Sequence, residues 1–159
     1  RWLEKGENPS AQYRRFFLTM LISALFCFVW LYHGLIPKVL FQHPLEVMMV
    51  ENSLTQVNTA NDRYVANATS LVYWIGVAEM LFALCWLVPR GKRLLFGLQI
   101  MLFPLLTLSA VLVDTDIAMA PFNPVTLNGA LWVLSIIGFV LSKDLPSAAS
   151  CIRKRGKKE

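Results

Sequence analysis

Charged residues are scarce in this sequence, and they are missing altogether from long stretches of it. Asp, Glu, Lys and Arg make up 16% of the 159 residues, against about 25% in an average soluble domain. None occurs in residues 16–36, 94–113 or 121–142, and residues 69–88 contain a single one, Glu79. A helix of about 20 residues crosses a hydrocarbon core of about 30 Å. A soluble domain of this length cannot bury four helices that are apolar on every side, so that class is excluded.

The sequence also has little of what cofactor and catalytic sites require. Its three cysteines, Cys27, Cys85 and Cys151, form no CxxC pair, which argues against a structural disulfide and against a dithiol redox site. His33 and His43 are the two histidines, and their similar expected depth near one membrane surface argues against a buried haem that both ligate. No phosphate-binding loop, haem signature or nucleophile–base motif is present. We therefore expect no cofactor in the chain itself.

The net charge of +5 does not indicate a nucleic-acid partner. Much of it lies in residues 153–158, which contain no aromatic side chain that would stack on a base. We expect this tail to act as a stop-transfer signal that faces anionic lipid, with a protein-docking tail as the alternative. Arg1 is not an initiator methionine, and we expect the chain to be a fragment, to be trimmed, or to be numbered from a later point. The first apolar run is too long for a signal-peptide core, so we interpret it as a retained anchor.

These patterns predict an all-α membrane protein, a bundle of four transmembrane helices. Asn123-Pro124 combines an N-cap residue with a proline at the first helical position, so the fourth helix should begin there. In the first outer loop, Leu45 and Met49 recur at helical spacing and predict a short amphipathic helix, whereas the polar stretch 52–67 is expected to be irregular. The expected parts are an N-terminal segment 1–15, a transmembrane domain 16–142 with spans at about 16–36, 69–88, 94–113 and 124–142, and a basic tail 143–159.

Basic residues indicate which side of the membrane each end of the chain faces. They precede the first span, occupy the connection between the second and third, and follow the fourth. The connection 37–68 leans acidic, and 114–120 has two acidic residues and no basic one. Loops rich in Lys and Arg stay on the cytoplasmic side. We therefore expect an integral protein of the plasma (inner) membrane, with the bilayer as its surroundings and both termini in the cytoplasm.

Glu79 lies near the middle of its span, and hence near the middle of the bilayer. An ionisable side chain at that depth costs about 2.5–3.5 kcal/mol on insertion scales, and no base is expected beside it. We therefore expect Glu79 to be protonated or linked to water, either in a neutral hydrogen bond between helices or in handling a proton or ligand. The spans also carry polar or small faces, such as Thr19 and Ser23 in the first and Ser135 in the fourth. These faces fit either close helix packing or an internal cavity that opens outward.

A second set of polar residues is expected where the spans reach the outer surface, and the fold can bring them together. His43 and Glu46 are weak candidates for a shared metal because they are one helical turn apart; otherwise no metal site is expected. Aromatic residues lie at a similar depth, near the mouth of the bundle. The members of the set are His33, Lys38, His43, Glu46, Asp114, Asp116, Asn123 and Asn128, with Trp30, Tyr73 and Trp74 nearby.

Three segments resemble motifs of the DoxX-like family of four-helix membrane proteins. Residues 30–38, WLYHGLIPK, resemble the G-x-x-x-K ending of the first helix, and residues 75–86, IGVAEMLFALCW, resemble the G-x-x-E pattern of the second. Residues 121–128, PFNPVTLN, are similar to the F-N-P-x-T-x-N start of the last helix, and the resemblance extends over about residues 16–141. No catalytic residue is predicted. The candidate ligand-binding residues are Trp30, His33, Lys38, Tyr73, Glu79, Asp114, Asn123, Thr126 and Asn128.

The resemblance implies several functions and does not decide between them. Some members look like subunits of quinone-linked thiosulfate oxidation, others associate with detoxifying redox enzymes, and distant relatives assist the assembly of membrane proteins. We therefore expect an accessory or quinone-linked subunit of a membrane redox system. Its electrons would come from a partner enzyme or from a nucleotide-binding reductase domain fused to the same chain. An assembly factor or scaffold, and a carrier of a small lipophilic ligand, are the alternatives, and the oligomeric state is left open.

The orientation predicts that Cys151 is shielded from reagents added outside intact cells. Because the basic tail around it is expected in the cytoplasm, a membrane-impermeant maleimide should modify Cys151 only after the cells are lysed. Mass spectrometry of the modified peptides distinguishes it from Cys27 and Cys85, which are expected within the bilayer. Modification of Cys151 in intact cells would contradict the predicted orientation.

Overall fold

Every regular element in the described part of the chain is a helix. The computed structural model describes residues 9–57, 67–113, 115–119, 121 and 123–144. Four helical stretches are long and apolar enough to cross a bilayer, which confirms the predicted fold class. The elements are α1 (Pro9–His33), the π-helical segment η1 (Gly34–Leu40), α2 (Pro44–Val57), α4 (Ala68–Cys85), α5 (Lys92–Val113), α6 (Thr115–Met119), α7 (Pro124–Leu141) and the short 3-10 turn η2 (Ser142–Asp144).

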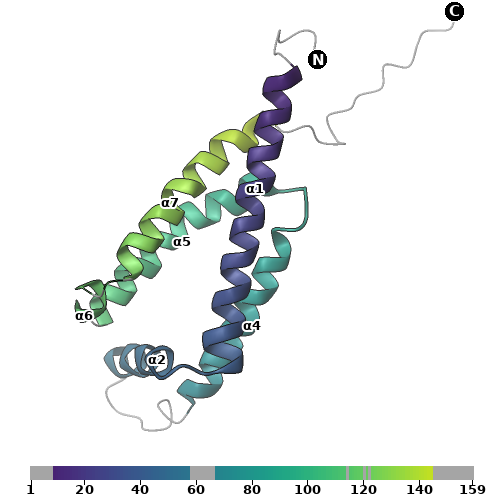
Figure 1. Cartoon of the computed structure of the whole chain (residues 1–159). Coiled ribbons are helices and arrows are strands. Elements are labelled where there is room, and N and C mark those ends of the chain that lie inside the picture. The colour runs from purple at the N-terminus through teal and green to yellow at the C-terminus, as the bar shows by residue number, and fades with distance from the viewer. Residues whose placement is uncertain (1–8, 58–66, 114, 120, 122, 145–159) are drawn as a thin grey trace, which may run out of the picture.

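The four long helices form two pairs that diverge toward one end of the molecule (Figure 1). α1 and η1 pack along α4, and α5 packs along α7. α2 lies across the wide end and contacts both α4 and α5, and α6 lies at the same end (Figure 1). We call the wide end of the bundle the α2 end and the narrow end the opposite end. The helix pairs therefore enclose a narrow half and a wide half, which are filled differently.

Aromatic side chains fill the narrow half of the bundle. The ring centroid of Phe26 lies 5.1 Å from that of Trp86 and 6.0 Å from that of Phe96, and Trp86 and Phe96 are 4.9 Å apart. Gly138 of α7 makes room for this cluster, because a Cβ there would overlap the Phe96 ring. Buried aromatic pairs at such distances add to the stabilisation that their burial already gives. These contacts join all four spans at the opposite end and leave the α2 end free to diverge.

The first span is longer than the sequence predicted. It was expected to end at Ile36, but the helix continues through η1 to Leu40 although Pro37 lies inside it. In this wider turn the Phe41 N–H donates to the Ile36 carbonyl at 3.1 Å, five residues back, as in a π-helix. Pro37 has no backbone N–H and cannot make the hydrogen bond of a regular α-helical turn, but the helix continues around it in this wider form. As a result Lys38 lies within the helix and not in a loop.

Two glycines allow η1 and α4 to come into backbone contact. A Cβ on Gly34 would lie 2.5 Å from the Gly76 carbonyl oxygen, and a Cβ on Gly76 would lie 2.7 Å from the Gly34 carbonyl oxygen. Small residues at such positions are the usual means by which membrane helices approach closely, since lipid provides no hydrophobic drive for their association. The contact sets the position of everything that η1 carries.

The ends of two helices can be compared with the sequence expectations. The Asn123 side chain accepts a hydrogen bond from the Thr126 N–H at 2.9 Å, and Pro124 is the first residue of α7, which confirms the predicted start of that helix. The amphipathic helix in the first loop is present as α2, but it continues through Val57. The expectation of irregular structure from Asn52 onward is therefore wrong for residues 52–57, and residues 58–66 lie outside the described residues.

Replacing Gly34 by Ala should destabilise the bundle, because the new Cβ would meet the backbone of α4. We expect Gly34→Ala to lower the free energy of unfolding by about 1–3 kcal/mol, as for other overpacked sites. Gly129→Ala is the matched control, since a Cβ at Gly129 meets nothing within 4 Å, and it should not lower the stability. Circular dichroism of the detergent-solubilised variants during heating measures the difference. Equal melting temperatures would contradict the close contact between η1 and α4.

Candidate functional site

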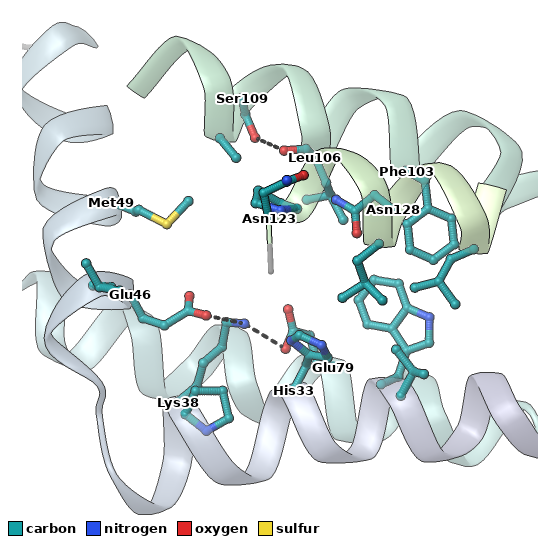
Figure 2. Close-up of a pocket in the computed structure, with 18 of the residues that line it drawn as sticks. His33, Lys38, Glu46, Met49, Glu79, Phe103, Leu106, Ser109, Asn123 and Asn128 are labelled. Carbon is teal, nitrogen blue, oxygen red and sulfur yellow. Dashed lines mark hydrogen bonds and ion pairs between the residues drawn. The ribbon is translucent and has the colours of Figure 1, made fainter. Parts of the chain in front are cut away.

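A cavity of about 480 Å³ occupies the wide half of the bundle. Ligand-binding pockets in proteins commonly have volumes of about 300–1,000 Å³. Most of the lining is apolar, and charged and amide side chains gather in it from several helices (Figure 2). The lining residues come from α1, η1, the 43–49 segment, α4, α5 and the start of α7, and include Trp30, His33, Lys38, His43, Glu46, Met49, Glu79, Phe103, Leu106, Ser109, Ala110, Asn123, Leu127, Asn128 and Leu131.

Lys38 connects two carboxylates at the wall of this cavity (Figure 2). Its Nζ lies 3.1 Å from Oε2 of Glu79 and 3.4 Å from Oε1 of Glu46. Lys38 is 8% exposed, so this ammonium depends on the carboxylates for most of the stabilisation that water would otherwise give. The expectation that no base lies near Glu79 is therefore wrong. The sequence placed Lys38 in an outer loop, whereas η1 carries it along the helix toward α4.

The missing side chain of Gly76 explains how Lys38 reaches Glu79. A Cβ on Gly76 would lie 2.7 Å from the Cβ of Lys38, so the stem of the lysine runs through the space that any larger residue would fill. Gly76 and Glu79 are three residues apart and share one face of α4. The lysine therefore crosses the helix at the glycine and meets the carboxylate one turn further on.

Aromatic and amide groups complete the lining on the side of α5 and α7. The rings of Trp30 and Phe103 are stacked, with centroids 6.1 Å apart and an interplanar angle of 25°. Asn128 projects from α7 near Phe103, and Asn123 lies closer to α2 (Figure 2). Flat rings beside amide groups suit a ligand that has both an apolar body and polar atoms.

The polar face of α1 and one residue of α7 serve packing and do not reach the cavity. Thr19 Oγ1 donates to the Arg15 carbonyl at 2.8 Å, and Ser23 Oγ donates to the Thr19 carbonyl at 2.7 Å. Ser135 Oγ of α7 donates to Oε1 of Gln99 on α5 at 3.2 Å, and both of these side chains are fully buried. These hydroxyls are satisfied within or between helices, as is common in membrane bundles.

The predicted candidates divide into those that line the cavity and those that do not. Tyr73 is exposed on α4, where its ring lies against Trp74, and it is not part of the lining. Thr126 lies in the first turn of α7, where its N–H donates to the Asn123 side chain and its Oγ1 donates to the Asn123 carbonyl at 3.2 Å, and it is not part of the lining. Asp114 lies outside the described residues. The candidates that line the cavity are Trp30, His33, Lys38, Glu79, Asn123 and Asn128, together with His43 and Glu46.

The weak metal candidates have other contacts. Glu46 pairs with Lys38, and Nδ1 of His43 accepts a hydrogen bond from the Leu45 N–H at 3.3 Å, at the start of α2. Among the residues that the structure describes, no three His, Cys, Asp or Glu side chains are grouped as metal ligands.

The sequence also missed the α5 wall of the cavity. Phe103, Leu106 and Ala110 follow one another at helical spacing and line it together with Ser109. The polar residue next to Leu106, Thr107, does not line the cavity, because its Oγ1 donates to the Phe103 carbonyl at 2.8 Å within the same helix. The available signal was the apolar period itself, which does not distinguish a cavity wall from an ordinary packing face.

Four apolar helices around a cavity that holds a buried ion pair define the class of the molecule, an integral four-helix membrane protein. A model of the DoxX-like family matches residues 27–136, more than half of the chain, so the chain belongs to the DoxX-like family. Every residue that lines the cavity, from Val29 to Leu131, lies within the matched range. No curated protein and no solved structure matches the chain.

Removing one carboxylate from the Lys38 pairs should destabilise the protein. Glu79→Leu leaves the buried ammonium with Glu46 alone, and we expect a loss of about 1–3 kcal/mol in the free energy of unfolding. Glu79→Gln keeps an acceptor and should lose less. The double variant Lys38→Met, Glu79→Leu should regain part of the loss, because a buried ion pair is often replaceable by apolar side chains together.

Thermal unfolding in detergent measures these differences, with Glu51→Leu as control. Glu51 lies on the same α2 helix as Glu46 but does not line the cavity, so its loss should leave the melting temperature unchanged. The single variant Lys38→Met is measured as well. If the loss of stability in the double variant equals the sum of the losses in Lys38→Met and Glu79→Leu, the two residues are not coupled.

Proposed function

We propose that the protein binds one small lipophilic molecule with a polar head in the cavity between its helix pairs. The observation that carries this proposal is the cavity itself, about 480 Å³ in volume and lined by charged, amide and aromatic side chains. A carboxylate pair and a lysine inside a membrane bundle are costly to maintain, and intramembrane ionisable groups commonly mark ligand or ion sites. Solid packing, as at the opposite end, would make a more stable protein without them.

The exposure of the lining residues supports access from the bilayer. Leu106 and Leu127 line the cavity and are 39% and 48% exposed. Both belong to helices that are long and apolar enough to span the membrane, so the proposed opening of the cavity is toward the bilayer. A ligand dissolved in the bilayer therefore meets an apolar opening first and the ion pairs afterwards.

A quinone-linked redox role is the second candidate, favoured by the stacked Trp30 and Phe103 rings. A quinone ring would lie against them, and its carbonyl oxygens would accept from donors such as Asn128 and the Lys38 ammonium. In that role the chain is an accessory subunit, and a partner redox enzyme or a fused nucleotide-binding reductase domain supplies the electrons. Its other support is the membership of the DoxX-like family, some of whose members look like redox subunits.

The proposed setting is the plasma (inner) membrane with both termini in the cytoplasm. Within the described residues, Lys38 is the one lysine or arginine at the α2 end. The others lie at the opposite end, where the positive-inside rule would place the cytoplasm. They are Arg14, Arg15, Arg90, Lys92, Arg93 and Lys143.

A bulky side chain at the cavity opening should exclude the ligand without unfolding the protein. Ser109 lines the cavity and is exposed, so the indole of Ser109→Trp has room to fill the opening. Leu108→Trp adds the same indole to the neighbouring exposed position, which does not line the cavity. We expect wild type and Leu108→Trp, purified in lipid nanodiscs, to retain a small molecule that Ser109→Trp loses.

Mass spectrometry of solvent extracts from the three samples measures this, with empty nanodiscs as the blank. A quinone among the retained molecules supports the redox role. Equal extracts from all three proteins would contradict ligand binding in the cavity, and a stoichiometric membrane-protein partner without any ligand would favour an assembly factor or scaffold instead.

A further inference from the structure

Among the described residues, two carboxyl groups but only one lysine line the cavity. Lys38 contributes one positive charge, and Glu46 and Glu79 contribute two negative ones, so the described lining carries a net charge of −1 with all three ionised. His33 and His43 are neutral in this count. No other lysine or arginine of the described residues lies at the α2 end. The second carboxylate of such a site is stabilised by a proton or by a further cation that joins it.

The geometry leaves acceptors for a second cation. Lys38 meets Oε1 of Glu46 and Oε2 of Glu79, and in Figure 2 no dashed line reaches the other oxygen of either carboxylate. A carboxylate accepts several hydrogen bonds, so each of these oxygens can take an N–H from a ligand. An anionic ligand would find the ammonium already engaged and two carboxylates beside it, and a neutral ligand would bring no cation to the second carboxylate.

We propose that the ligand is a hydrophobic amine that binds in its protonated form. This inference rests on the proposed ligand-binding function and names the class of ligand. The ammonium lies between the free oxygens of Glu46 and Glu79 and brings the charge of the site to zero. Its apolar body extends toward Trp30 and Phe103, whose ring faces also attract cations. Leu106 and Leu131 are among the other apolar residues that line the cavity.

Binding of a matched pair of probes to the protein in nanodiscs tests the proposal. 2-(2-Naphthyl)ethylamine is charged at neutral pH, and its N-acetyl derivative keeps the naphthalene but has no charge. After subtraction of binding to empty nanodiscs, we expect the amine to bind at least about tenfold more tightly. Glu46→Gln should weaken amine binding by about tenfold and leave the acetyl derivative unchanged. Glu51→Gln removes a charge from the same helix outside the cavity and should change neither.

The outcomes separate this inference from the proposed function. Equal affinities for the two probes, or equal weakening by Glu46→Gln and Glu51→Gln, would overturn the amine ligand. If decylubiquinone binds to wild type and fails to bind to Ser109→Trp, while the amine does not bind, the cavity is a ligand site but the inference about charge is wrong. If none of the three probes binds, both the inference and the proposed function fail. Glu79→Gln provides a second test of the charge. The Glu46→Gln substitution should disturb folding less, because Glu46 is the more exposed of the two carboxylates.

Discussion

A carboxylate in a membrane-spanning helix needs a counter-charge, and the arrangement of the α2 end follows from how Glu79 obtains one. The cation that pairs with it, Lys38, comes directly after Pro37, where a helix would ordinarily have stopped. The π-helical turn carries the chain past the proline, and the contact between Gly34 and Gly76 brings η1 onto α4. Lys38 then reaches Glu79, and its second contact, with Glu46, links α2 to the same point. The wider turn at Pro37 and the two glycines together bring Lys38 to the buried carboxylate of Glu79.

The two halves of the bundle have different tasks. At the opposite end, interlocked rings and the Gln99–Ser135 hydrogen bond join all four spans. At the α2 end the helix pairs separate, and part of the possible packing is absent. Proteins commonly place stability and function in different regions in this way, because a binding site requires open space and polar groups that a core avoids. The aromatic half supplies the rigidity on which the open half depends.

Much of the fold was predictable, because the bilayer imposes simple rules on a sequence. Long apolar stretches, three without a charged residue and one with Glu79 alone, predicted four spans, and Asn123-Pro124 predicted the start of α7. Glu79 was recognised as unusual for the same reason. Its partner was missed because a proline is a strong signal of a helix end, and a π-turn leaves no clear pattern in one sequence. Tyr73 was assigned to the site by its depth, but depth does not determine on which side of a helix a residue lies.

The pairing of Lys38 with Glu79 is the central claim of this account, and a distance measurement tests it most directly. Solid-state NMR of the protein in lipid bilayers, with ¹⁵N-labelled lysine and ¹³C-labelled glutamate, reports dipolar coupling between the ammonium nitrogen and a carboxyl carbon. Glu46→Gln removes the second contact, and Lys38→Arg assigns the signal. With Nζ 3.1 Å from Oε2 of Glu79, the account predicts a strong coupling that survives Glu46→Gln and disappears in Lys38→Arg. A Lys38 signal without coupling to any carboxyl carbon in the Glu46→Gln protein would contradict it.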